Sequence, residues 1–294
     1  MPELPDIEVY VDRITAFAGG QPLRRLAIVN PFILRSVEPA AAALAGRTLQ
    51  AVRRSGKRIV LDFGDEYFAV LHLMIAGRLR WLPAGKRPPA RLALAAFEFA
   101  SGTLLFTEAG SKRRASLHLV HGSAALAAFD AGGLDVRTSD VDAFAARLTS
   151  ENHTLKRALT DPRLFSGIGN AYSDEILHRA RLSPLALSRS LSAEEIARLH
   201  AAAREVLDEW TARLREQTGS GFPENVTAFR PEMAVHGKFG QPCPVCGAPV
   251  QRIVYAENEA NYCARCQTGG RLLADRALSR LLHASWPKSI DELG

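Results

Sequence analysis

The first six residues of the chain (MPELPD) could supply a nucleophilic amine. If Met1 is removed, the chain begins with Pro2, whose secondary amine would titrate at about 7.7–8.0 and be partly neutral at pH 7. Such an amine can attack a sugar or aldehyde carbon and form an imine, and Glu3 beside it can move protons. Taken alone, these residues fit an ordinary helix start with Pro5 in its first turn better. The rest of the chain favours the chemistry.

Four cysteines near the C-terminus have the spacing of a metal site. Cys243 and Cys246 form one C-x₂-C pair, and Cys263 and Cys266 form a second pair after sixteen intervening residues. Four thiolates at this spacing can surround one tetrahedral Zn²⁺ on a β-hairpin, an arrangement called a zinc ribbon. Because four protein ligands leave no position for water, this zinc would be structural. A redox C-x₂-C pair and an iron–sulfur site are the alternatives.

Two groups of basic residues could face phosphate. Lys57 follows a basic turn at the start of a predicted strand, and is either a solvated cation or one that faces phosphate or a reacting base. Between two later predicted strands lies a basic loop that contains Lys112, Arg113 and Arg114. By charge alone this loop is either solvated or in contact with phosphate.

A glycine-rich turn lies between two predicted helices in the middle of the chain. Gly167 and Gly169 would let the backbone approach a ligand closely, and the N-terminus of the next helix offers N–H groups to an anion. Asn170 could bind a phosphate oxygen or cap that helix, and Lys156 upstream adds a cation. A tight turn without a ligand is the alternative.

Composition limits the class of protein. The chain has 294 residues, of which 47% are hydrophobic and 23% charged, as in a globular protein of one large or two ordinary domains. A net charge of +6 favours a polyanionic partner. The sequence shows neither a signal peptide nor a long apolar run. We therefore expect a soluble, intracellular monomer of the cytoplasm or nucleoid, without membrane contact.

The elements that must position these residues change in type along the chain. An amphipathic helix over residues 5–18 would anchor the N-terminus. Short β-rich runs bounded by turn residues follow it and predict an antiparallel sandwich or barrel. These runs are 26–29, 48–53, 58–63, 67–73, 78–82, 92–99, 103–106 and 115–119. Helical patterns follow over 123–130, 141–148, 154–159, about 170–181 and 192–217.

Taken together and in order, these motifs resemble the formamidopyrimidine-DNA glycosylase and endonuclease VIII family. The resemblance covers about residues 2–267 and includes His72-Leu73 in the hairpin after Lys57. It implies an α+β fold: a helix-bearing antiparallel β-sandwich, then a helix–two-turn–helix domain with a zinc-ribbon β-hairpin. The expected domains are residues 1–130 for the catalytic sandwich, 131–235 for the helical domain, 236–270 for the zinc finger and 271–294 for a C-terminal extension containing a helix over 272–282.

The resemblance implies a base-excision-repair DNA glycosylase with AP lyase activity, which flips an oxidised base out of the duplex. Pro2 would attack C1′ of the deoxyribose, displace the base and form a Schiff base that leads to β- or β,δ-elimination. Glu3 would protonate the sugar ring oxygen and shuttle protons, and Lys57 would assist proton transfer or hold phosphate. Contacts to backbone phosphates would come from Lys156, Gly169 and Asn170.

The sequence departs from the family pattern at several positions. Asp6 stands where the family usually has Glu, and the methionine that fills the gap left by the flipped base falls at Met74 or Ile75. The loop that supplies an arginine and a wedge phenylalanine is replaced by residues 108–114, without the phenylalanine. Asn258 stands where the finger usually has a phosphate-clamping arginine. Lesion preference therefore does not carry over.

Three other functions were weighed against a duplex glycosylase. The first is an endonuclease-VIII-like preference for oxidised pyrimidines or for single-stranded or bubble DNA. The second is a catalytically silent protein that binds damaged or abasic DNA on the same scaffold. The third, a zinc-ribbon transcription factor, leaves Pro2, Glu3 and Lys57 unexplained. Borohydride trapping on abasic DNA separates an enzyme from a binding protein.

Overall fold

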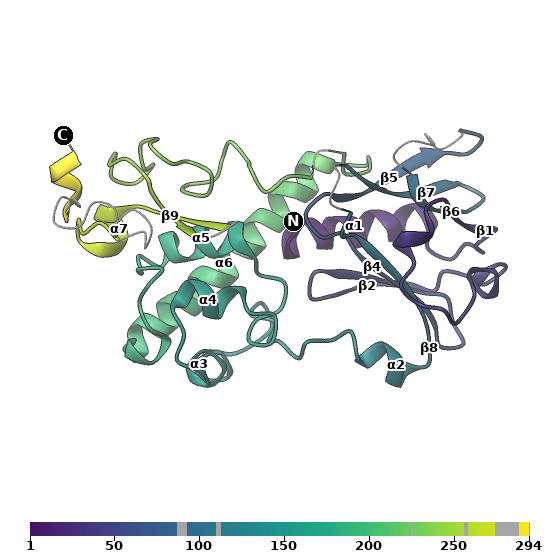
Figure 1. Cartoon of the computed structure of the whole chain (residues 1–294), viewed down its shortest axis with the longest axis horizontal. Coiled ribbons are helices and arrows are strands. Elements are labelled where there is room, and N and C mark those ends of the chain that lie inside the picture. The colour runs from purple at the N-terminus through teal and green to yellow at the C-terminus, as the bar shows by residue number, and fades with distance from the viewer. Residues whose placement is uncertain (87–92, 110–112, 225, 256–257, 274–287, 294) are drawn as a thin grey trace. The chain divides into compact units, whose positions relative to one another are not determined.

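The computed structural model describes residues 1–86, 93–109, 113–224, 226–255, 258–273 and 288–293 (Figure 1). Contacts divide the chain into two compact units. The first comprises residues 1–131 and 210–227, and the second comprises 132–209 and 228–294. Among the described residues, no helix has both the length and the apolar character needed to cross a membrane. The fold is α+β, as the sequence predicts.

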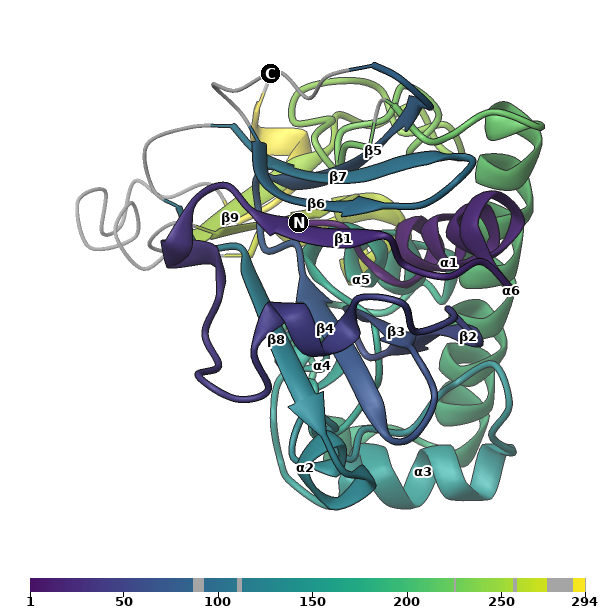
Figure 2. The same ribbon diagram turned by 90° about the vertical axis from the view of Figure 1, so that its right-hand side faces the viewer.

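The first unit is built on two four-stranded antiparallel sheets. Their strand orders are β1-β6-β7-β5 and β2-β3-β4-β8. Figure 2 shows the two sheets one above the other, with helix α1 (Leu4–Ala18) alongside them. All eight predicted strands are present, with ends shifted by a few residues. They are β1 (Arg25–Ile28), β2 (Ala51–Ser55), β3 (Arg58–Asp62), β4 (Tyr67–His72), β5 (Gly77–Pro83), β6 (Ala93–Glu98), β7 (Gly102–Glu108) and β8 (Ser116–His121).

Alternating side chains decide which face of each strand is buried. In β3, Ile59 and Leu61 enter the large core that both sheets share, while Val60 between them belongs to a second apolar cluster. Leu126 of helix α2 (Ser123–Ala127) packs against this second cluster. Side chains alternate between faces in a strand. Both faces of β3 are therefore covered, and its buried positions form a continuous apolar run instead of an alternating one.

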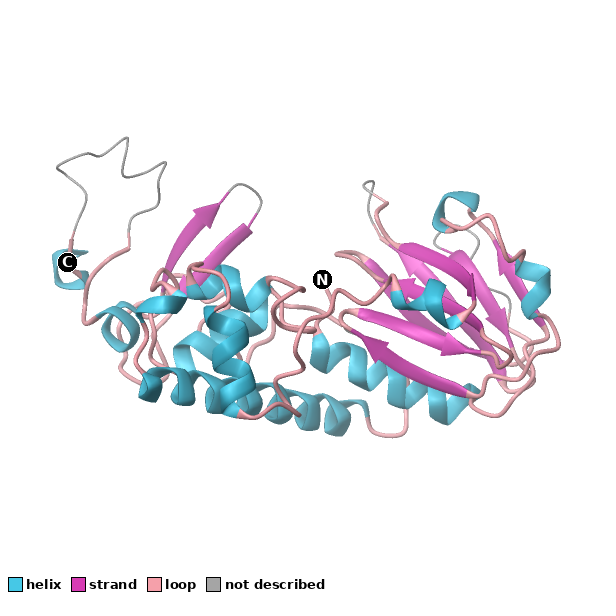
Figure 3. Ribbon diagram, turned by 90° about the horizontal axis from the view of Figure 1, so that it is seen from below, coloured by secondary structure: helices cyan, strands magenta, loops and turns pink. Residues whose placement is uncertain are grey.

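The second unit is mainly helical and carries a β-hairpin, as the cyan and magenta elements of Figure 3 show. Its helices are α3 (Val141–Thr149), α4 (Leu155–Thr160), α5 (Asn170–Arg179), α7 (Ala264–Thr268) and the part of α6 (Ala193–Thr218) that precedes Trp210. The hairpin pairs β9 (Gln251–Tyr255) with β10 (Asn258–Tyr262). Single 3₁₀ turns lie at Pro31–Ile33, Ala41–Leu44, Ser188–Ser190 and Ile290–Leu293. Most of the helix expected over 272–282 falls in residues 274–287, outside the described residues.

A returning segment completes the core of the first unit. Residues 210–227 are expected from the sequence to belong to the helical domain, whereas in the structure their contacts place them with the sandwich. The reason is apolar packing. The ring of Phe222 lies 5.9 Å from those of Tyr10 and Phe17 and 6.3 Å from that of Trp81, centroid to centroid. The segment therefore covers part of α1 that would otherwise face water.

Truncating this aromatic contact should destabilise the first unit. We expect Phe222→Ala to lower the free energy of unfolding by about 2 kcal/mol, less than for a fully buried phenylalanine because Phe222 is only partly buried. Denaturant unfolding monitored by circular dichroism measures the change. Phe32→Ala is the matched control, since Phe32 is 76% exposed in the same unit, and it should change stability by less than about 0.5 kcal/mol. Equal losses in the two variants would show that the returning segment is not part of the core.

Candidate functional site

The start of the chain is buried and capped. Pro2 and Glu3 are both buried, and Glu3 is the N-cap residue of α1. Its backbone N–H donates to the Asp6 Oδ2 at 3.0 Å, while its carboxylate accepts from the backbone N–H three positions into the helix. This reciprocal pair is a capping box. Asp6, one of the departures from the family pattern, is therefore long enough to hold the N-terminal residues in place.

The terminal amine lies in an environment that favours its neutral form. Burial lowers the pKa of the Met1 amino group below its ordinary value, because desolvation penalises the charged form. The charges of Arg78 and Lys57 lower this pKa further, against the opposing effect of Glu3 and Asp6. An amine at this end of the chain is thus more nucleophilic near neutral pH than a solvated one.

Lys57 lies in the two-residue turn between β2 and β3, one residue before the strand. Gly56 occupies the first turn position with a φ of 60°, which suits glycine in a tight hairpin. Arg54 ties this turn to α1. Its Nε lies 2.7 Å from the Glu8 Oε1, its Nη1 donates to the Gly56 carbonyl at 3.2 Å, and both charged side chains are largely buried. No motif in the sequence indicates this ion pair, because its two residues lie far apart along the chain.

The turn between β4 and β5 separates the two candidates for the gap-filling residue. Met74 is half-buried with a φ of 52°, in the left-handed region, while Ile75 is 60% exposed. The Gly77 N–H donates to the Leu73 carbonyl at 2.8 Å, and a Cβ on Gly77 would meet that oxygen at 2.2 Å. Arg78 Nη1 donates to the Ile75 carbonyl at 3.0 Å. The turn thus fixes Ile75, not Met74, as the exposed apolar side chain.

His72 is neutral at physiological pH. Burial lowers its pKa to about 4, and the nearby positive charges of Arg58 and Lys57 and the ring of His118 lower it too. Its imidazole can therefore donate and accept hydrogen bonds at pH 7 without adding charge. The sequence analysis recognised His72 as part of a motif but assigned it no chemical role.

The basic loop after β7 is fastened at its described end. The Glu108 Oε1 accepts the backbone N–H groups of Arg114 at 2.9 Å and Ala115 at 3.0 Å. Arg113 and Arg114 are exposed. Lys112 lies outside the described residues. The buried Glu108 thus fixes the backbone at the end of the loop, while the arginine side chains of the loop remain in contact with solvent.

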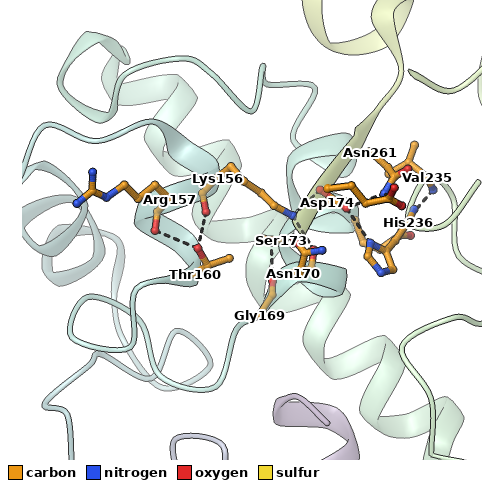
Figure 4. A network of polar contacts seen from close by, with 12 residues as sticks. Lys156, Arg157, Thr160, Gly169, Asn170, Ser173, Asp174, Val235, His236 and Asn261 are labelled. Atoms are coloured by element: carbon orange, nitrogen blue, oxygen red, sulfur yellow. Dashed lines mark hydrogen bonds and ion pairs between the residues drawn. The ribbon is translucent and has the colours of Figure 1, made fainter. Parts of the chain in front are cut away.

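In the second unit, Lys156 is a residue of α4 whose side chain reaches the start of α5. Its Nζ donates to the Asn170 carbonyl at 2.6 Å and contacts the Asp174 Oδ1 at 2.5 Å (Figure 4). The N-cap residue of α5 is Gly169, and Asn170 is the first helical residue. Of the two roles predicted for Asn170, capping is therefore wrong, because its side chain is one position too far into the helix. Gly167 has a φ of 82°, which the turn before α5 requires.

The four cysteines meet in one cluster. All four Sγ atoms lie within 4.8 Å of one another, with Cys243 to Cys266 at 3.9 Å and Cys246 to Cys263 at 3.3 Å. Four thiolates at about 2.3 Å from a tetrahedral zinc have their sulfurs about 3.8 Å apart. The cluster therefore fits one structural zinc ion. As predicted, a β-hairpin separates the two cysteine pairs.

Surrounding residues hold this cluster in place. The His178 Nε2 lies 3.3 Å from the Cys243 Sγ, and Gln267 accepts the Cys263 N–H at 2.8 Å. At the other end of the hairpin, Asn258 pairs with Tyr255. The tip between them, residues 256–257, lies outside the described residues.

Comparison with known proteins is consistent along the chain. Residues 1–114 match the formamidopyrimidine-DNA glycosylase N-terminal domain, residues 134–220 match the H2TH domain of the same enzyme, and residues 240–269 match a zinc finger found in FPG and IleRS. The formamidopyrimidine-DNA glycosylase of Thermus thermophilus is 35% identical over 286 residues, covering 92% of this chain and 100% of the relative. That of Moorella thermoacetica is 32% identical over 269 residues, covering 86% and 94%.

Similarity also extends to an uncharacterized relative and to solved structures. A formamidopyrimidine-DNA glycosylase-like protein of Mycobacterium tuberculosis is 42% identical over 149 residues, covering 51% of this chain and 90% of the relative. Lactococcus lactis Fpg in complex with abasic-site DNA has the same fold, with a TM-score of 0.79 and 24% identity over 90% of this chain and 99% of that one. By domain composition, sequence identity and coverage, this chain belongs to the formamidopyrimidine-DNA glycosylase family of enzymes.

Proposed function

We propose that this protein is a base-excision-repair DNA glycosylase with AP lyase activity, acting on damaged DNA at the nucleoid. The observation that carries the proposal is the buried, capped N-terminus, where burial and nearby cations lower the pKa of the terminal amine. The relatives named for formamidopyrimidine excision and a solved complex of Lactococcus lactis Fpg with Fapy-dG DNA support this substrate class.

In this proposal, the Pro2 amine is the nucleophile. After removal of Met1, its lone pair attacks C1′ of the flipped nucleotide, and the C1′–base bond breaks with its electrons leaving on the base. Glu3 protonates the ring oxygen, so the sugar opens to an iminium ion on Pro2. Loss of a proton from C2′ then expels the 3′ phosphate, which cuts the strand. Lys57, whose charge acts on the terminal amine, and the neutral His72 near Lys57 would hold phosphate or pass protons.

We further propose that the second unit grips the DNA backbone. Lys156 and the start of α5 at Gly169 and Asn170 offer a cation and a helix N-terminus to a phosphate. Arg113, Arg114 and Lys112 add positive charge from the first unit. Catalysis is assigned to residues 1–130, backbone contact to 131–235 and 236–270, and the extension 271–294 is left without a role.

Ile75 is the residue proposed to fill the space of the flipped base. It is exposed and apolar on a turn that hydrogen bonds hold, whereas Met74 is half-buried with a constrained backbone. A β-branched side chain is shorter and stiffer than methionine. With the wedge phenylalanine absent from residues 108–114, the cost of flipping is offset less well in a matched duplex.

The first prediction concerns Pro2. The mature chain should lack Met1, and borohydride should trap it on abasic DNA through Pro2, as peptide mapping by mass spectrometry would show. A solvated terminal amine has a pKa of about 8. Because burial lowers the pKa of this amine, trapping should persist at that pH and decline only at lower pH, when the amine becomes protonated. A tag fused before Pro2 should abolish trapping, and the same tag at the C-terminus should not. Tight abasic-site binding without trapping would identify a silent binding protein instead.

The second prediction concerns the metal. Metal analysis should find one zinc per chain, and Cys246→Ser should lose zinc and DNA affinity together, because metal binding is coupled to folding of the ribbon. Val245→Ala is the matched control. Val245 lies between the same two ligands and is 60% exposed, so this variant should keep both properties. Active protein without zinc would contradict the assignment.

The third prediction concerns lesion preference. Single-turnover excision of 8-oxoguanine opposite cytosine should be slow compared with cleavage at abasic sites and with excision of oxidised pyrimidines or of lesions in single-stranded or bubble DNA. Ile75→Ala should slow excision from a matched duplex roughly tenfold, equivalent to about 1.4 kcal/mol of lost apolar contact. It should have less effect on single strands, where nothing needs to be unpaired.

Val37→Ala is the control for this experiment, because Val37 is 93% exposed on the same unit and should leave every rate unchanged. Fast excision of 8-oxoguanine opposite cytosine with complete double elimination would show that other residues replace both the wedge and the missing arginine at Asn258.

A further inference from the structure

A buried carboxylate joins three separate segments of the second unit. Asp174 lies on α5 with its side chain fully buried. Its Oδ1 is 2.5 Å from the Lys156 Nζ of α4, and its Oδ2 accepts from the His236 Nδ1 at 2.8 Å and the Asn261 Nδ2 at 3.4 Å (Figure 4). Asn261 belongs to β10, a strand of the zinc-finger hairpin. One carboxylate thus connects the cation of the helix–two-turn–helix to the finger.

The adjacent acid strengthens this connection. The Glu175 carboxylate accepts the backbone N–H groups of Ala234, Val235 and His236 at 2.8–2.9 Å. His236 is therefore held by its backbone on Glu175 and by its ring on Asp174. Because a carboxylate only accepts hydrogen bonds, the Nδ1 of His236 must carry a proton. The segment just before the first cysteine pair is fixed at two points.

This arrangement determines where the Lys156 ammonium lies. Lysine has a long flexible side chain, and a free one loses conformational freedom when it grips a phosphate. Here the side chain is only 12% exposed and is already fixed, because Asp174 and the Asn170 carbonyl take two of the three ammonium N–H donors. Within the part of the chain that the structure describes, these two contacts leave one donor for a further acceptor at the N-terminus of α5. A phosphate oxygen at that point would meet a cation that is already in place.

We propose that Asp174 is a positioning residue for DNA binding, which fixes the Lys156 ammonium at the start of α5 and, through His236 and Asn261, couples this cation to the zinc-finger hairpin. The inference rests on the proposed function in one respect, namely that Lys156 contacts a backbone phosphate. An unpaired buried charge is strongly unfavourable. The network therefore acts as a unit, and loosening one contact of the carboxylate should loosen the lysine.

The test is a double-mutant cycle on DNA affinity. Dissociation constants for a duplex with a stable abasic-site analogue are measured against salt concentration for the unmodified chain, Lys156→Ala, Asp174→Asn and the double variant. Lys156→Ala should weaken binding and reduce the salt slope by about one unit. Asp174→Asn should weaken binding in the same direction, by about fivefold or more, although it removes a negative charge. In the double variant the Asp174 change should add less than about twofold.

Controls separate positioning from charge and from folding. Asp161→Asn removes one acid from the same unit, where Asp161 bonds the exposed Arg163, and it should not weaken binding. Zinc content and thermal unfolding are measured for each variant. If Asp174→Asn loses zinc, His236→Gln replaces it in the cycle. This variant loosens one side of the carboxylate and should weaken binding only when Lys156 is present.

Three results would overturn the inference. Independent, additive losses from Lys156→Ala and Asp174→Asn would mean that the carboxylate acts on the fold and not through the lysine. Wild-type affinity for Asp174→Asn would mean that the carboxylate has no role in binding. An unchanged salt slope for Lys156→Ala would show that Lys156 does not contact a phosphate, and Asp174 would then have no cation to position for DNA binding. The glycosylase proposal would then still stand or fall on trapping at Pro2, which this experiment does not involve.

Discussion

The end of the chain is held still by the capping box between Glu3 and Asp6, a constraint that the proposed nucleophilic role of Pro2 requires. The N-terminal residues of most domains are poorly ordered unless tied down. Here the cap fixes them to α1, whose Ile7, Tyr10 and Ile14 are fully buried in the core of the sandwich. The two sheets, the Arg54–Glu8 ion pair and the returning segment with Phe222 all hold that helix. Burial then has an electrostatic consequence, since it lowers the pKa of the terminal amine.

The second unit meets a different constraint, because it buries charge. Asp174 and Glu175 are adjacent acids inside a helical domain, and both are satisfied by donors from other segments. Asp174 connects α5 to α4 and to the finger hairpin. Glu175 connects α5 to residues 234–236, which lead into the finger. The four-cysteine zinc site holds together the two chain segments that flank the β9–β10 hairpin. A binding surface built this way is rigid before DNA arrives, which lowers the entropic cost of association.

Sequence patterns predicted what local physics determines. Strand and helix periodicity located the elements, and cysteine spacing predicted the zinc cluster, because those ligands come in short local pairs. Long-range contacts were beyond such patterns. Phe222 sits in a Gly- and Pro-rich stretch whose composition indicates a loop, and only the fold shows that it packs on Tyr10. Asp174 looks like an ordinary surface acid on a helix, since its partners lie far away in sequence. The predicted helix start at about residue 170 is confirmed, while the N-cap is Gly169 and not Asn170, a difference of one position that is typical at helix ends.

The turn at Met74 shows how backbone geometry decides between residues that sequence alone leaves equivalent. A methionine in the left-handed region costs energy that a glycine would not, and Gly77 is required because any side chain there would clash with the Leu73 carbonyl. Strain of this kind persists only where the surrounding contacts impose it. Here Arg78 donates a hydrogen bond to the Ile75 carbonyl within the same turn. The strain at Met74 and the exposure of Ile75 are therefore two results of one tight turn. The strand that follows this turn, β5, contains Arg78, whose charge lowers the pKa of the terminal amine.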